Sequence, residues 1–361
     1  PRVSDHQPEP VPVMKIKIFL WILLIAGAVG PRSRAAETDK LTFRYVESNG
    51  IRMHLAEQGE GPLIILCHGF PESWYSWRHQ IPVLAKAGYH VVVPDQRGYG
   101  KTDKPQAIDE YNLFKLAGDI VGVVQALGET EAIIIGHDWG APVAWTCSLL
   151  RPDLFKRLVL LSVPYSPRQA GSTPPIAGAK AAGEKSGRVF YQVTFQDPKR
   201  SEEIFDQNPR GFLTAALIGA SGDAPPESRW NPWSDPAERR SAPAPSEPLQ
   251  LPAWLTEADL DFYTHQFEET GFRGGFNWYR NIDFNWLHTG FLIDAKISQP
   301  TLFVAGEHDG VLKFAGGAVE RLEQNVPRLS KKVILPGKGH WIQQEAPEEV
   351  NRLILEFLAN R

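Results

Sequence analysis

Asp138 lies at the centre of a small-residue turn that could present a nucleophile. Residues 136–140 read Gly-His-Asp-Trp-Gly and follow directly on the apolar run Ala132–Ile135. Small residues two positions before and after the central residue let a strand turn sharply into a helix and expose the central side chain. Asp stands where Ser is usual, so the pattern predicts a carboxylate nucleophile. Asp is also common in turns and at helix N-termini, and the assignment therefore depends on further residues.

A carboxylate and a histidine that could complete a catalytic triad follow later in the chain. The apolar run Thr301–Val304 leads into Ala-Gly-Glu-His-Asp, which ends at Asp309, and the run Lys332–Leu335 leads into a glycine-flanked loop with His340. The order nucleophile, acid, histidine is that of hydrolases built on such a turn. We predict His340 as the general base and Asp309 as the acid that orients it, with Glu307 as the competing orienter.

An oxyanion hole requires two backbone N–H groups near the nucleophile. The apolar run Leu63–Cys67 leads into a tight turn, His-Gly-Phe-Pro, at 68–71. We predict that the amide of Phe70 converges with the amide of Trp139, the residue after the nucleophile. His68 is expected to be structural, because a second general base has no task in this arrangement.

The elements that must position these residues alternate between strand-like and helix-like segments from Leu41 onward. Buried parallel strands are typically unbroken apolar runs bounded by turn-forming or charged residues. Such runs lie at Leu63–Cys67, His90–Val93, Ala132–Ile135, Leu158–Leu161, Thr301–Val304 and Lys332–Leu335. Helical spacing of apolar residues predicts helices over Leu113–Leu127 and Ala141–Leu150. The alternation predicts an α/β fold with a mostly parallel, doubly wound sheet.

The alternation breaks between about Pro164 and Ala295, a stretch too long for a simple crossover connection. Its flanks, Val189–Phe195 and Leu260–Trp286, are rich in aromatic residues that could form a packed layer. We predict an inserted, mainly helical cap domain over the C-terminal edge of the sheet, where open α/β sheets bind ligands. The middle, 222–252, is dense in Pro, Ser and Ala and is expected to be a surface excursion with little regular structure. It could fold over the entrance, mediate self-association or do neither.

The N-terminus resembles a secretory signal. Met14 is followed by two lysines, an apolar run over 18–30 and small residues that suit cleavage, so we expect an exported, periplasmic or secreted protein whose mature chain begins near Ala36. The run is shorter than the roughly 20 residues that cross a bilayer, which makes a retained membrane anchor the weaker alternative. The predicted divisions are the extension 1–35, the first part of the core 36–165, the cap 166–295 and the second part of the core 296–361.

Composition narrows the functional classes. The 361 residues are 42% hydrophobic and 22% charged, with a formal net charge of -4, which gives no basic surface for nucleic acid. Cys67 and Cys147 are the only cysteines, and both lie in apolar segments that favour buried thiols. Neither a disulfide framework nor a zinc site is supported. We expect no cofactor, no metal and no nucleic-acid partner, and the sequence predicts no oligomeric state.

From about Leu41 to the C-terminus, these motifs resemble the epoxide hydrolase branch of the α/β-hydrolases. The core motifs that carry the resemblance are His-Gly-Phe-Pro at 68–71, Asp-Gln-Arg-Gly-Tyr-Gly at 95–100, the turn at 136–140, Asp309 and Gly-His-Trp at 339–341. The cap motifs that strengthen it are Phe-Tyr-Gln at 190–192 with Phe-Gln-Asp-Pro at 195–198, and Gly-Phe-Arg-Gly at 271–274 with Asn-Trp-Tyr-Arg-Asn at 277–281. The resemblance implies the α/β-hydrolase fold, with Tyr191 and Tyr279 as proton-donating lid tyrosines. We also expect Phe70, Trp139 and Gln192 to contact the substrate.

A carboxylate nucleophile suits displacement at a saturated carbon. Attack on an ester carbonyl would give a high-energy anhydride, whereas attack on an epoxide carbon gives an ordinary ester of Asp138. Water activated by His340 can then hydrolyse this ester. The leaving alkoxide needs a proton, and phenols with a reference pKa of about 10 are suitable donors. The predicted reaction is the hydrolysis of a small hydrophobic epoxide to a vicinal diol.

Three other functions share part of this pattern. A haloalkane dehalogenase would also use Asp138, but its halide leaves without an acid, and that family usually has Asn in place of Phe70. A haloacid dehalogenase of this fold usually carries Arg where this chain has Trp139. A non-catalytic ligand-binding protein would have no need of His340 and its orienting acid. The residues favour epoxide hydrolysis over all three.

Overall fold

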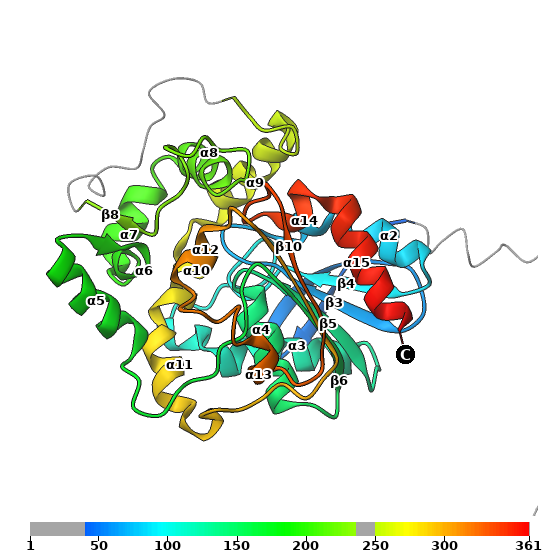
Figure 1. Ribbon diagram of the computed structural model, residues 1–361. Coiled ribbons are helices and arrows are strands. Elements are labelled where there is room, and N and C mark those ends of the chain that lie inside the picture. The colour runs from blue at the N-terminus through cyan, green and yellow to red at the C-terminus, as the bar shows by residue number, and fades with distance from the viewer. Residues whose placement is uncertain (1–39, 236–249, 361) are drawn as a thin grey trace, which may run out of the picture.

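The computed structural model describes residues 40–235 and 250–360, and its core is an eight-stranded sheet (Figure 1). The sheet has the order β1-β2-β4-β3-β5-β6-β9-β10. The strands are β1 (Thr42–Ser48), β2 (Ile51–Gln58), β3 (Leu63–Cys67), β4 (His90–Pro94), β5 (Ala132–His137), β6 (Phe155–Leu161), β9 (Thr301–Gly306) and β10 (Leu329–Leu335). β2 pairs antiparallel with β1 and β4, and the other neighbouring pairs are parallel. The predicted mostly parallel sheet is confirmed.

The six apolar runs all lie in this sheet. β3 has the predicted bounds, and each of the other five strands extends its predicted range at one end. The two N-terminal strands lack such runs. β1 lies at the edge and is exposed along most of its length, so it alternates polar and apolar residues and gives a weaker signal.

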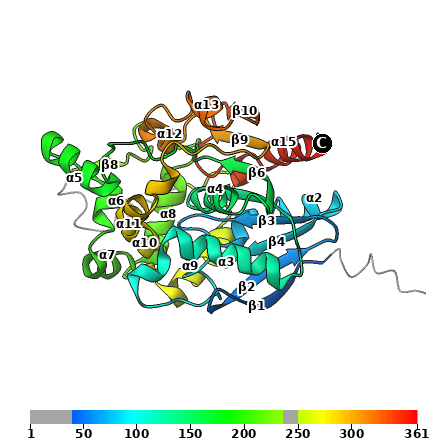
Figure 2. The same cartoon turned by 90° about the horizontal axis from the view of Figure 1, so that it is seen from below.

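Helices cover both faces of the sheet, as a doubly wound fold requires. α3 (Leu113–Ala126) and α4 (Gly140–Leu150) pack on one face, and α2 (Ile81–Lys86) and α15 (Pro347–Ala359) on the other (Figure 2). The buried side chains accordingly divide into two clusters. One contains Leu116 and Val143 from the first pair of helices, and the other contains Leu84 and Leu353 from the second pair.

A second group of helices lies beyond the C-terminal ends of the parallel strands (Figure 2). They are α5 (Pro175–Ser186), α6 (Tyr191–Thr194), α7 (Pro198–Phe205), α8 (Pro209–Gly219), α9 (Glu257–Thr270), α10 (Arg273–Arg280) and α11 (Ile282–His288). They form the helical cap expected over this edge of the sheet. Their inner aromatic side chains, among them Phe195, Phe267 and Phe276, join the core cluster on the side of α3 and α4.

Part of the Pro-rich segment is described. Residues 222–235 contain one short strand, β8 (Trp233–Ser234), which pairs antiparallel with β7 (Val189–Phe190). This pairing anchors the start of the excursion beside α6. Residues 236–249 lie outside the described ranges, as does the predicted N-terminal signal. Within residues 40–235 and 250–360, no helix has the length and apolar character needed to cross a bilayer.

Candidate active site

The turn between β5 and α4 places Asp138 at the C-terminal edge of the sheet. Asp138 has φ of +49°, in the left-handed region that non-glycine residues rarely adopt. A side chain at Gly136 would collide with the carbonyl of Gly140, and one at Gly140 would collide with the carbonyl of Cys67. The two glycines therefore allow the close approach of strand and helix. Backbone strain of this kind concentrates at functional sites.

The predicted triad assembles around this carboxylate. His340 Nε2 lies 3.4 Å from Asp138 Oδ2, and its Nδ1 lies 3.1 Å from each carboxylate oxygen of Asp309. Asp309 is 1% exposed and is held by the amide of Val311, which donates to its Oδ1 at the start of α12 (Gly310–Phe314). The competing orienter Glu307 has a side chain that is 57% exposed and accepts from the amide of Gly337. The geometry therefore favours Asp309.

The charges of the triad are coupled. Burial alone would lower the pKa of His340, but the adjacent carboxylates of Asp309 and Asp138 outweigh burial and raise this pKa well above 6.5. Burial would raise the pKa of Asp138, but hydrogen bonds from His340 and from the amide of Phe70 outweigh burial and lower it. The resting site therefore favours an ionised Asp138 beside a protonated His340.

The turn after β3 supplies one of the two predicted oxyanion donors. The amide of Phe70 donates to Asp138 Oδ1 over 2.8 Å. Trp139, which carries the other predicted amide, is the N-cap residue immediately before α4, and its ring packs edge-on against Tyr279 at 5.2 Å between centroids. His68 is fully buried, bonds the carbonyl of Gly69 through Nδ1 and accepts the amide of Gln96 at Nε2. His68 thus holds the turn that carries Phe70, which fits the expected structural role.

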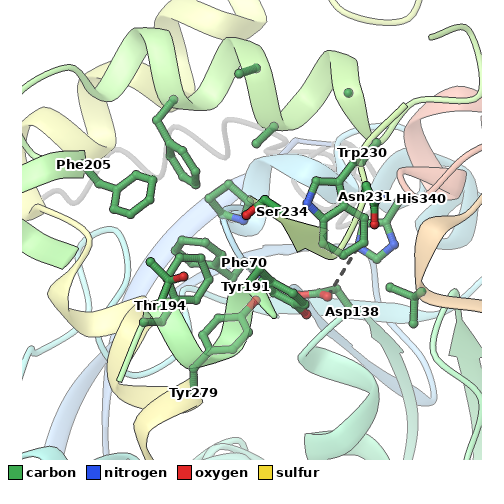
Figure 3. A pocket seen from close by; sticks show the side chains of 18 of the residues that line it. Phe70, Asp138, Tyr191, Thr194, Phe205, Trp230, Asn231, Ser234, Tyr279 and His340 are labelled. Atoms are coloured by element: carbon green, nitrogen blue, oxygen red, sulfur yellow. Dashed lines mark hydrogen bonds and ion pairs between the residues drawn. The ribbon is translucent and has the colours of Figure 1, made fainter. Parts of the chain in front are cut away.

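Both predicted lid tyrosines face the nucleophile. Tyr191 begins α6 and Tyr279 lies in α10, yet their ring centroids are only 5.9 Å apart. Figure 3 shows both phenols beside Asp138, with His340 on the far side of the carboxylate. Burial is the largest influence on both phenols and raises the pKa of each, so both stay protonated at neutral pH.

A cavity of about 430 Å³ separates the cap from the core. Its catalytic wall is formed by Asp138, His340, Tyr191 and Tyr279, together with Phe70. The rest of the lining comes from α7, α8 and the segment before β8, and includes Phe205, Phe212, Ala216, Trp230 and Asn231. In Figure 3, Trp230 and Asn231 lie beside His340. A largely apolar cavity of this size with a few convergent polar groups is typical of a small-molecule site.

Two residues predicted to contact substrate are placed differently. Trp139 and Gln192 are not among the described residues that line the cavity, although Phe70 is. Both contact the lid tyrosines instead. Trp139 packs on Tyr279, and the side-chain amide of Gln192 donates to the Tyr191 hydroxyl over 3.0 Å.

Sequence reasoning missed the buried network that joins the three catalytic loops. Glu72 Oε2 accepts the amide of Gly69 and bonds His137 Nδ1, while His137 Nε2 bonds the carbonyl of His340. Glu72 and His137 are both completely buried. The position of Glu72 in the same turn as Phe70, and of His137 next to the nucleophile, is the signal that could have identified them.

Comparison with known proteins agrees with this geometry. The family model described as the alpha/beta hydrolase fold matches residues 62–347. Epoxide hydrolase A of Mycobacterium tuberculosis is 42% identical over 327 residues, which cover 88% of this chain and 97% of the relative. Epoxide hydrolase 3 of Siraitia grosvenorii is 38% identical over 327 residues, which cover 89% of this chain and 99% of the relative.

Solved structures show the same relationship. An epoxide hydrolase from an endophytic Streptomyces superposes with a TM-score of 0.83 at 44% identity, over 88% of this chain and 95% of that one. An epoxide hydrolase from Vigna radiata superposes with a TM-score of 0.81 at 37% identity, over 90% of this chain and 99% of that one. The chain belongs to the epoxide hydrolases of the α/β-hydrolase fold.

Proposed function

We propose that this enzyme opens an epoxide to a vicinal diol through a covalent ester on Asp138. The observation that carries the proposal is a carboxylate at a strained turn, with a histidine on one side and two phenols on the other. The histidine can activate water, and the phenols can protonate a leaving oxygen. One cavity thus holds the groups for both halves of the reaction.

In the first half-reaction, Asp138 Oδ2 attacks an epoxide carbon. The amide of Phe70 holds Oδ1, which leaves Oδ2 as the attacking atom. As the new C–O bond forms, the ring C–O bond breaks, and the departing oxygen takes a proton from Tyr191 or Tyr279. The raised pKa of each phenol keeps its proton in place until an alkoxide, which is more basic still, develops beside it.

The second half-reaction depends on a change of charge. Ester formation neutralises Asp138 and so removes one of the two carboxylates that raise the pKa of His340. His340 can then lose its proton, which restores the lid phenol that was deprotonated in the first half-reaction. The neutral imidazole acts as a base on water, while Asp309 holds its orientation. Hydroxide adds to the aspartyl carbonyl, and the oxyanion forms at Oδ1, where the amide of Phe70 already donates. Collapse expels the diol, whose oxygen takes the proton from His340, and the Asp138 carboxyl that remains passes its proton to His340, which restores the resting charges.

The rival reaction of an alkyl halide would use the same nucleophile. A halide leaves as a stable anion that needs no proton, so the two phenols on the cavity wall would have no role as acids. A ligand-binding protein would need neither the strained turn nor the oriented histidine. The paired phenols therefore favour the epoxide.

The proposal is tested by rapid-quench measurement of Asp138 alkylation. Tyr191→Phe and Tyr279→Phe should each slow alkylation by trans-stilbene oxide. The double variant should be slower than wild type by a factor of about 10² to 10⁴, the usual contribution of a general acid. Tyr45→Phe removes a phenol on β1 and serves as the matched control, with an unchanged rate. Alkylation by the epoxide at the wild-type rate in the double variant would remove the acid role. Faster wild-type alkylation by benzyl bromide than by the epoxide, with no effect of either tyrosine, would favour the dehalogenase.

A further inference from the structure

The amide of Gln192 makes a direct contact with one of the two lid tyrosines. Its Nε2 lies 3.0 Å from the hydroxyl oxygen of Tyr191, the preceding residue on α6. Gln192 is half-buried and lies outside the set of described residues that line the cavity. A polar side chain next to a catalytic group, with its donor aimed at that group, calls for a chemical explanation.

The backbone around this contact is fixed from two sides. The amide of Tyr191 donates to the carbonyl of Pro232 over 2.9 Å. The side chain of Gln196 donates to the carbonyl of Gln192 over 3.0 Å and to the carbonyl of Tyr279 over 2.9 Å. These bonds hold α6 against α10 and against the segment before β8. Gln196 thus sets the backbone positions of both tyrosines, whereas the amide of Gln192 acts on a side-chain hydroxyl.

A phenol has one proton to give and an oxygen that can accept hydrogen bonds. When an amide N–H occupies the accepting side, the phenol proton cannot point at the amide nitrogen and turns elsewhere. For Tyr191 the open direction is the cavity, which the phenol lines together with Asp138 and Tyr279. We propose that Gln192 is a positioning residue that keeps the Tyr191 proton directed at the oxygen of the opening epoxide. The inference rests on the acid role proposed above for Tyr191.

The same bond changes in strength during the reaction. As Tyr191 gives up its proton, its oxygen gains negative charge, and a hydrogen bond to a charged oxygen is about twice as strong as one to a neutral oxygen. Gln192 therefore stabilises the transition state more than the resting enzyme, which is the condition for a contribution to rate. We expect its loss to slow alkylation by about 10-fold.

The test is a double-mutant cycle on single-turnover alkylation by trans-stilbene oxide. Gln192→Met, which keeps the length of the side chain without the donor, should slow alkylation by about 10-fold. The same change in the Tyr191→Phe background should have no effect, because the group on which Gln192 acts is gone. A structural role would give the same loss in both backgrounds, and that result would overturn the inference.

Gln192→Glu adds a second measurement, the pH profile of alkylation, which would stay unchanged if Gln192 had only a structural role. An ionised carboxylate can only accept, so it should capture the Tyr191 proton and slow alkylation further, by about 100-fold at pH 8. Activity should recover as the pH falls and the new carboxyl gains a proton to donate. Gln207→Glu, on the exposed loop between α7 and α8, is the matched control and should show the wild-type pH profile.

The outcomes separate the two proposals. If Tyr191→Phe slows alkylation and Gln192→Met slows it equally in both backgrounds, the acid role stands and the role of Gln192 fails. Faster alkylation by Gln192→Met would show that Tyr191 donates to the amide oxygen, which also overturns the inference. If Tyr191→Phe leaves alkylation unchanged, both proposals fall together.

Discussion

Glu345 holds the loop that carries His340, and its removal should be costly. Glu345 is 7% exposed, and its carboxylate accepts from three backbone amides. Oε2 accepts from Gly222 and Gly339 over 2.9 Å each, and Oε1 accepts from Trp341 over 3.0 Å. Gly339 and Trp341 flank His340, and Gly222 belongs to the cap. One side chain therefore ties the histidine loop to the cap.

The size of the effect follows from these three bonds. A buried donor left without an acceptor costs about 1 to 3 kcal/mol, so Glu345→Ala would cost about 3 to 9 kcal/mol if nothing relaxed. Entry of water reduces the cost, and we expect a loss of about 3 to 4 kcal/mol in the free energy of unfolding. Glu345→Gln keeps one acceptor oxygen. Burial also raises the pKa of Glu345, so replacement by Gln removes a disfavoured charge, and its cost should stay within about 1 to 2 kcal/mol.

Urea denaturation of both variants at neutral pH measures these differences. Glu203→Ala, at an exposed position of α7, is the control and should stay within about 0.5 kcal/mol of wild type. In Glu345→Ala, hydrolysis of the ester should slow more than its formation, because the histidine loop is loosened. A loss below about 1 kcal/mol for Glu345→Ala would refute the assigned role of the three bonds.

Three further predictions concern the site itself. Asp309→Asn should slow ester hydrolysis by roughly 10² to 10⁴, since His340 loses its orienting charge, and rapid-quench assays should show the ester accumulating. Gly219 lines the cavity, and an added Cβ there meets only ordinary contacts with Ser228 and Trp230, at 3.8 Å or more. Gly219→Leu should therefore keep the fold but reduce kcat/KM for trans-stilbene oxide about 10-fold more than for styrene oxide, the smaller substrate. The pKa of His340 is raised in the folded state, so protonation of this histidine stabilises the fold, in full below about pH 6.5, the pKa of an unfolded histidine. This stabilisation is lost as the pH rises through the pKa of the folded state. Thermal unfolding from pH 6 to 10 should show this loss in wild type and lack it in His340→Gln.

The core of the fold could be predicted because its buried strands are continuous apolar runs. The strand β3 is buried at every residue, and its bounds were read without error from Leu63 to Cys67. The edge strand β1 could not be predicted in this way, because it is exposed along most of its length. The predicted triad could also be found, since Asp138, Asp309 and His340 each lie in the turn or loop after a strand that the sequence reveals.

The lining of the cavity could not be predicted in the same way. Phe205 and Phe212 come from α7 and α8, and Trp230 from the segment before β8, and only tertiary packing brings them to face Asp138. The contact of Gln192 with Tyr191 depends on a rotamer, so the sequence could not predict the hydrogen bond between the two side chains. Local motifs thus define the reacting groups, and packing defines what surrounds them.

The covalent ester on Asp138 is the central claim, and the most direct measurement is the intact mass of His340→Gln after incubation with trans-stilbene oxide. Without its base the variant should still be alkylated but should not release the diol, because water is no longer activated. We expect a protein heavier by the mass of one epoxide, with the adduct on the peptide that contains Asp138. An unmodified mass, in a folded variant that binds the epoxide, would contradict it.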